Sequence, residues 1–162
     1  MRLYHGSFLE VRKPLLRYGR ERTDFGKGFY TTTSSEQAEK WAKIKKDREK
    51  ASRAIVNVYE MDDALLADPT LRIREFNGVD ESWLDFVVSC RKDNSAKHDF
   101  DLVFGPVAND NVFTTVNLYE SGILDAQAAM AQLRAYKTYD QLFFHSERVI
   151  RALRYIESYE VE

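Results

Sequence analysis

The stretch DFGKGFY at residues 24–30 places two glycines directly before an aromatic pair. Gly26 and Gly28 allow the backbone to approach other groups closely, and Phe29-Tyr30 has the aromatic character of a β-strand. The dinucleotide fingerprint GxGxxG is absent, because these glycines lead into a strand where that fingerprint would open a helix. The stretch therefore predicts a glycine-rich turn followed by a strand, and argues against a doubly wound Rossmann sheet.

Patterns on both sides of this stretch predict short strands that alternate irregularly with helices. Residues 8–23 lack periodicity and are expected to form a long basic loop. Further strands are expected at residues 2–5, 54–59, 71–76, 100–104 and 141–144. Helices are expected at 35–51 behind a capping box at Ser34 and Gln37, after Asp80, at 110–119, from Asp125 to about 136, and from Ser146 through Val149, Ile150, Leu153 and Ile156. This irregular order favours an α+β fold.

Length and composition indicate one globular domain over residues 1–162. Hydrophobic residues make up 44% and charged residues 31% of the chain, which is too apolar for a disordered protein. The sequence has no signal-like start and no apolar run of bilayer length, and Cys90, its single cysteine, is expected in the core. His5, His98 and His145 lack metal-ligand spacing. We therefore expect a cytoplasmic protein without a metal or membrane contact.

Charge is distributed unevenly along the chain. Residues 1–53 hold 14 Lys/Arg against 7 Asp/Glu, whereas residues 54–162 hold 10 against 19. The first third is therefore expected to bind anions. Within it, residues 40–53 carry seven basic and two acidic side chains, which is more typical of a solvated helix face than of a nucleic-acid site.

Three short motifs resemble those of a known superfamily. They are His5-Gly6-Ser7, the stretch at residues 24–30, and QAEKW at residues 37–41. The chain resembles the ADP-ribosyltransferase superfamily of the poly(ADP-ribose) polymerase and diphtheria-toxin type, and in particular a bacterial group of uncharacterised domains within it. The resemblance implies split antiparallel β-sheets with flanking helices, and NAD as the substrate.

The first motif is implied to bind the adenosine and nicotinamide ends of NAD. By the resemblance, His5 is expected to be a catalytic residue that hydrogen-bonds the adenosine ribose. Gly6 would offer backbone groups to the nicotinamide amide, because a side chain there would block the approach. Ser7 would contact a ribose hydroxyl. For His5, the alternative is a histidine satisfied by neighbouring backbone at a strand end.

The second and third motifs are implied to enclose the nicotinamide ring. Tyr30 would place its ring against one face, Trp41 would close the other, and Gly28 and Phe29 would line the cofactor site. Stacking and cation–π attraction each contribute on the order of 1 kcal/mol toward a planar cation. The alternative for Trp41 is a place in the core, since Ala38 and Ala42 flank it on an apolar stripe.

Arg20 and Arg22 are candidates for binding the pyrophosphate of NAD. Both precede the glycine-rich turn, and a guanidinium can bind phosphate oxygens in pairs. An unstructured basic loop is the alternative.

The third catalytic position departs from the superfamily pattern. Gln141 best matches the position of the usual glutamate, and an amide keeps the hydrogen bonds but lacks the charge and basicity of a carboxylate. Chain elongation is therefore not expected. Glu147, Asp101 and Asp110 are the other acidic candidates, with helix-start, turn and cap roles as their alternatives.

The resemblance implies a mono-ADP-ribosyltransferase that cleaves the nicotinamide–ribose bond of NAD and transfers ADP-ribose to a protein or nucleic acid. A toxin of a toxin–antitoxin or defence system, with an antitoxin partner, would fit by analogy. Three alternatives stay open: an NAD glycohydrolase, a non-catalytic NAD-, ADP-ribose- or RNA-binding module, and a generic domain with accidental motifs.

Overall fold

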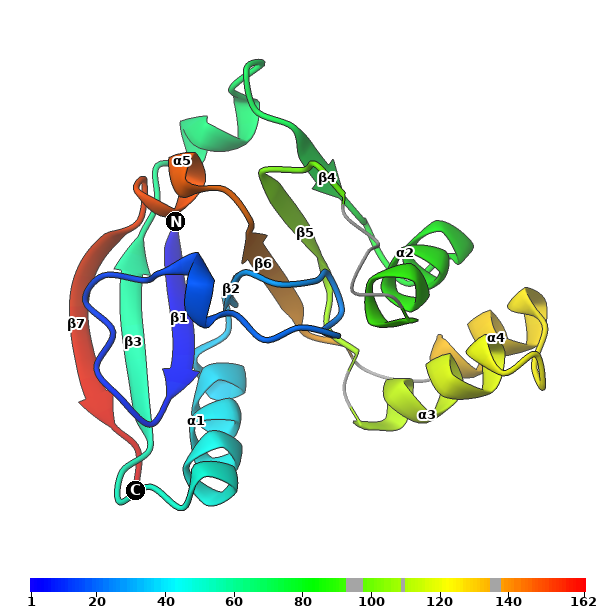
Figure 1. The fold of residues 1–162 in the computed structure, drawn as a ribbon, viewed down its shortest axis with the longest axis horizontal. Coiled ribbons are helices and arrows are strands. Elements are labelled where there is room, and N and C mark those ends of the chain that lie inside the picture. The colour runs from blue at the N-terminus through cyan, green and yellow to red at the C-terminus, as the bar shows by residue number, and fades with distance from the viewer. Residues whose placement is uncertain (93–97, 109, 135–137) are drawn as a thin grey trace.

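Two β-sheets form the centre of the protein in a computed structural model that describes residues 1–92, 98–108, 110–134 and 138–162 (Figure 1). The three-stranded sheet is antiparallel, with the order β1 (Arg2–Ser7), β3 (Ile55–Glu60), β7 (Arg154–Glu160). The four-stranded sheet has the order β2 (Phe29–Thr31), β6 (Asp140–Phe144), β5 (Leu102–Pro106), β4 (Ile73–Glu75), and only its β4–β5 pair is parallel. The α+β class is confirmed.

A backbone bridge joins the two sheets. Tyr4 of β1 and Thr32, one residue after β2, exchange hydrogen bonds of 2.8 and 2.9 Å between their amide nitrogens and carbonyl oxygens. This bridge brings the first and second sequence motifs together, although residues 5–7 and 24–30 lie far apart in the chain.

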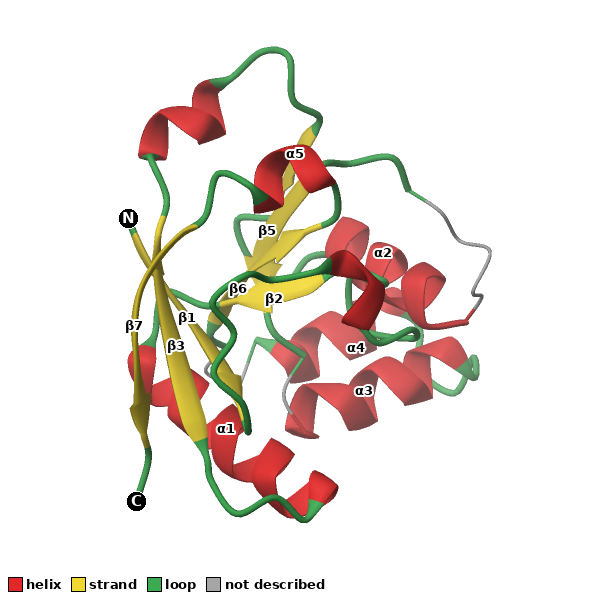
Figure 2. Cartoon of the chain, turned by 60° about the vertical axis from the view of Figure 1, so that its left-hand side comes forward, coloured by secondary structure: helices red, strands yellow, loops and turns green. Residues whose placement is uncertain are grey.

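Helices cover both sheets (Figure 2). Helix α1 (Ser35–Glu49) packs on β1 and β3, whereas α2 (Glu81–Lys92), α3 (Asp110–Glu120) and α4 (Ala126–Leu133) gather against the four-stranded sheet. Helix α5 (Glu147–Ile150) is a single turn, and two 3-10 helices span Leu16–Tyr18 and Asp63–Ala67. Among the described residues, no helix combines the length and the apolar character that crossing a bilayer requires.

The core follows the two-residue alternation of the strands. Phe143 of β6 packs toward α2–α4, whereas Leu142 and Phe144 pack between the two sheets. On β2, Tyr30 packs toward α2–α4 and Phe29 packs between the two sheets. A third cluster joins α1 to the outer face of the three-stranded sheet.

Capping side chains begin the helices where the sequence predicts them. Ser34 Oγ accepts from Gln37 N at 3.2 Å, and Asp80 Oδ1 accepts from Trp83 N at 2.7 Å. Asp125 does the same for α4, whose expected end near residue 136 lies outside the described residues. Cys90 is buried as expected, and burial raises the pKa of its thiol to about 12.

The expected helix from Ser146 through Ile156 is wrong. The helix stops at Ile150, and Arg154–Glu160 forms strand β7 beside β3. Val149 and Ile150 are buried, as the helical spacing implies, but Ile156 packs beside Tyr159 in a strand. Pairing with an open edge of β3 therefore overrides a weak local helical pattern.

Candidate functional site

The Tyr30 phenol fixes the glycine-rich turn that precedes it. Its oxygen donates to Gly26 O at 2.8 Å, accepts from Phe25 N at 3.0 Å, and lies 2.8 Å from Thr23 Oγ1. The ring packs on Phe143 with the centroids 4.7 Å apart. Burial raises the pKa of this phenol well above its ordinary value. In this structure the hydroxyl therefore binds the chain's own backbone.

We expect Tyr30→Phe to lower the free energy of unfolding by about 1–3 kcal/mol, because Phe25 N and Gly26 O lose a buried partner. Urea denaturation monitored by circular dichroism measures this loss. Tyr18→Phe is the matched control, since Tyr18 is 74% exposed and should change little. Equal stability of the two variants would contradict the role of the phenol in the turn.

Two histidines also contact the backbone of this turn. His98 Nε2 lies 2.7 Å from Phe25 O, and His145 Nδ1 lies 2.9 Å from Lys27 O. Phe100 N donates to His98 Nδ1 at 3.3 Å, so the proton of His98 is on Nε2. Burial lowers the pKa of His98. Sequence reasoning missed this pair because the residues lie far apart along the chain.

His5 joins the two motifs through the backbone of Tyr30. Its Nδ1 lies 2.6 Å from Tyr30 O, so Nδ1 carries the proton and Nε2 is an acceptor. Its ring stacks on Phe29, a core residue, with the centroids 4.4 Å apart. Burial, followed by the charge of Lys45, lowers the pKa of His5 well below its usual value.

The structure brings the imidazole of His5 to the backbone of Tyr30 and not to its ring. Neighbouring side chains of a strand point to opposite faces. The phenol accordingly packs toward α2–α4, while the imidazole lies with Phe29 between the sheets. Gln141 alternates with Leu142, and it lies on the same side as the phenol.

Gly6 is buried beneath α1, at the edge of β1 that has no strand partner. Tyr4 bonds to Thr32 on the edge away from β3, and alternate residues of a strand share an edge, so the Gly6 N–H and C=O point away from β3 as well. A Cβ on Gly6 would lie 3.0 Å from Trp41 Cβ. Trp41 is half-buried and belongs to none of the three core clusters, and its Cβ lies on the side of Gly6 that α1 covers.

Lys45 also reaches the open edge, and sequence reasoning missed it. Its Nζ donates to Gly6 O at 2.6 Å and lies 3.4 Å from His5 Nε2. Desolvation, followed by the charges of Arg48 and Arg20, lowers its pKa to about 8. The signal was its spacing, because position 45 is four residues after Trp41 and continues the inward stripe of α1.

Gln141 is the centre of a buried polar network. Its Nε2 donates to Asp24 Oδ2 at 3.0 Å and to Pro106 O at 3.2 Å. Asp24 also accepts from Ala108 N at 2.9 Å and from Arg91 Nε at 3.1 Å. Asp24 lies within the quoted stretch at residues 24–30, yet its role was not predicted. The amide at position 141 therefore donates to a carboxylate that stands beside it.

The remaining predicted cofactor residues differ in burial: Gly28 and Ser7 are buried, whereas Arg20 and Arg22 are exposed. Gly28 is needed for packing, since a Cβ there would lie 2.5 Å from Phe144 O. Ser7 is buried, and its Oγ accepts from Leu9 N at 3.3 Å. Arg20 and Arg22 are exposed on the basic loop.

The alternative acidic candidates have structural contacts. Glu147 lies in the first turn of α5, with Arg151 Nε 3.9 Å away. Asp101 Oδ2 accepts from Arg72 N at 2.9 Å. The side chain of Asp110 lies outside the described residues. Glu147 therefore has the helix-start position that was its alternative, whereas Asp101 bonds the backbone of a segment 29 residues away.

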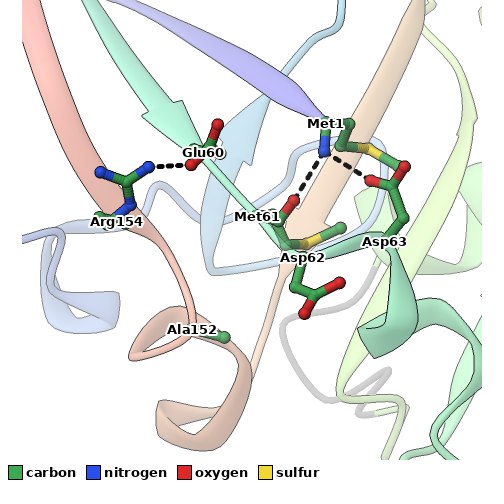
Figure 3. A pocket seen from close by; sticks show the side chains of 7 residues that line it. All are labelled: Met1, Glu60, Met61, Asp62, Asp63, Ala152 and Arg154. Carbon is green, nitrogen blue, oxygen red and sulfur yellow. Dashed lines mark hydrogen bonds and ion pairs between the residues drawn. The ribbon is translucent and has the colours of Figure 1, made fainter.

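A hollow at the opposite end of β1 contains none of the predicted site residues (Figure 3). Here the amino group of Met1 donates to Met61 O at 2.7 Å and to Asp63 Oδ1 at 2.5 Å. Glu60 and Arg154 pair across its rim. The hollow is separate from the Gly6 edge, because Met1 and Gly6 lie at the two ends of one strand.

The fold and site define an α+β protein of two small sheets, in which the edge strand β1 carries a buried glycine beneath a basic helix. The chain belongs to the family described as "Protein of unknown function (DUF3990)", which matches residues 1–155. No curated protein and no solved structure matches the chain.

Proposed function

We propose that this protein is an NAD-dependent mono-ADP-ribosyltransferase with an ADP-ribosyltransferase-like split-sheet fold. The observation that carries the proposal is the edge of β1 at Gly6, which has no strand partner and lies buried beneath α1 near Trp41 and His5. A carboxamide such as that of nicotinamide needs one donor and one acceptor; the Gly6 N–H would be the donor, and the Gly6 carbonyl, which already accepts from Lys45 Nζ, would use its second lone pair as the acceptor. Trp41 supplies an aromatic face beside them.

In the proposed reaction, the bond between C1′ of the ribose and the nicotinamide nitrogen breaks, and nicotinamide leaves with the electron pair. A nucleophile of the acceptor forms the new bond to C1′ and releases its proton to solvent water. His5 Nε2 would accept a hydrogen bond from a ribose hydroxyl group. The Gln141 amide would at most hydrogen-bond the substrate, which fits a single transfer better than chain elongation.

Nicotinamide release tests the proposal. Purified protein is incubated with NAD labelled on the adenylate half and a cell lysate, and both free nicotinamide and labelled macromolecules are measured. We expect both products, with Trp41→Ala at least about tenfold slower because stacking and ring burial are lost. Tyr18→Ala, an exposed aromatic on the basic loop, is the matched control. Release without labelled macromolecules would indicate an NAD glycohydrolase.

A non-catalytic NAD- or ADP-ribose-binding module is the second candidate. The contact between Gln141 Nε2 and Asp24 Oδ2 favours it, because the position of the usual catalytic carboxylate holds a neutral amide that is already bonded. Calorimetry that detects NAD binding, together with no nicotinamide release, would select this candidate over the enzyme. The toxin role and the antitoxin partner stay predictions.

A further inference from the structure

Asn77 and Gly78 lie in the loop that connects β4 to α2, away from the Gly6 edge. Residues 76–80 belong to no helix or strand, the Asn77 side chain is exposed, and Gly78 is half-buried. In the described part of the chain, no hydrogen bond reaches the Asn77 side chain or the Gly78 backbone nitrogen. Neither group is therefore held back from the other by a bond within the protein.

Glycine at position 78 leaves the approach of these two groups unhindered. A Cβ there would meet no atom within 4 Å, and a glycine backbone adopts conformations that other residues cannot. Asparagine is one of the thermolabile residue types. When glycine follows it, the glycine nitrogen can reach the side-chain carbon Cγ and close a ring. The sequence contains this Asn-Gly pair once.

We infer that Asn77 is a site of spontaneous deamidation, with water as the co-reactant. The Gly78 nitrogen loses its proton to solvent and bonds to Asn77 Cγ, the bond from Cγ to Nδ2 breaks, and ammonia leaves with a proton taken from solvent. Water then opens the resulting succinimide. Cleavage of the bond from Gly78 N to Cγ gives aspartate, and cleavage of its bond to the Asn77 backbone carbonyl carbon gives isoaspartate. The net reaction consumes one water and releases one ammonia.

The isoaspartate product would lengthen the backbone between two anchored residues. Phe76 is buried, and its backbone nitrogen donates to Phe104 O at 2.8 Å. Asp80 Oδ1 accepts from Trp83 N at 2.7 Å at the start of α2. Isoaspartate therefore adds a backbone atom that residues 77–79 must absorb, whereas aspartate leaves the backbone unchanged and adds only a negative charge.

Peptide mapping of protein aged in buffer tests the site. Trypsin releases residues 75–91, in which Asn77 is the only side-chain amide, and chromatography with mass spectrometry separates the asparagine, aspartate and isoaspartate forms. We expect conversion to increase with time and with pH, because the Gly78 nitrogen must lose its proton. The tryptic peptide 54–72 is the internal control and should stay unconverted, since its one amide, Asn57, is buried in β3 before Val58.

Gly78→Ala separates the chemistry of this pair from the fold. The added methyl group meets no other part of the folded protein but hinders the approach of the nitrogen to Cγ, so conversion should slow about tenfold or more. Asn77→Asp models the aspartate product and should melt close to the wild type, whereas aged protein that carries isoaspartate should melt lower. Absence of isoaspartate from peptide 75–91, or equal conversion in wild type and Gly78→Ala, would overturn the site.

Discussion

Gln141→Glu is expected to lower the free energy of unfolding by about 3–5 kcal/mol at pH 7, even though the superfamily resemblance places a glutamate at this position. The amide nitrogen now donates to Asp24 Oδ2 and Pro106 O, and the residue is 7% exposed. A carboxylate at position 141 would place an oxygen against Asp24 Oδ2 and Pro106 O, and neither contact would have a proton for a hydrogen bond. Urea denaturation at pH 7 measures the loss.

The pH dependence of the Gln141→Glu variant has a definite sign. Burial and the Asp24 carboxylate would raise the pKa of the introduced carboxyl group in the folded state above the value of about 4.3 in the unfolded chain. The folded state then binds more protons, so the deficit relative to wild type should shrink as the pH falls toward about 4.3 and grow as it rises. A deficit that does not vary with pH would contradict the placement of Asp24 beside this position.

Exchanging the two groups is the sharpest control. In Asp24→Asn/Gln141→Glu, the amide and the carboxylate trade places and a hydrogen bond between them is restored, so the double variant should be more stable than the sum of the single losses by about 1 kcal/mol or more. Gln127→Glu on the exposed surface of α4 should change stability by less than about 0.5 kcal/mol. Additive losses would show that Asp24 and Gln141 are not coupled.

Local sequence patterns predicted the parts of the fold that depend on neighbours in the chain. Ser34, Asp80 and Asp125 each accept a hydrogen bond from the first turn of the helix they were expected to cap. The strand after Gly28 and the burial of Cys90 follow from equally local signals. The same local patterns did not predict the C-terminal strand β7, because its partner β3 lies in the first half of the chain.

Motif resemblance predicted that two distant segments of the candidate site meet, but it did not predict the contacts of Asp24. The motifs at residues 5–7 and 24–30 do meet, through His5 and the carbonyl of Tyr30. The contact of Asp24 with Gln141 spans 117 residues and that with Arg91 spans 67, so no spacing rule connects them. The helical spacing of Lys45 could have predicted its inward position, but the run of charged residues around it suggested a solvated helix face.

Gly6→Ala is expected to lower the free energy of unfolding by about 3 kcal/mol, at the upper end of what overpacking costs. The added Cβ would lie 2.7 Å from Ala42 N and nearer still to Ala38 O. Both are backbone atoms of α1, so no side-chain rotation relieves the clash and the helix must move away from β1. Chemical denaturation of the variant measures the cost.

Gly78→Ala is the control that shows whether the loss of stability is specific to Gly6. A Cβ on Gly78 would meet no atom within 4 Å, so Gly78→Ala should change stability by less than about 1 kcal/mol. Because Trp41 and Lys45 belong to the helix that Gly6→Ala displaces, any folded fraction should also bind ADP-ribose more weakly than the Gly78→Ala control. If both alanine variants were equally stable and bound ADP-ribose equally, α1 could not lie on β1 at Gly6, and the proposed nicotinamide site between Gly6 and Trp41 would lose its support.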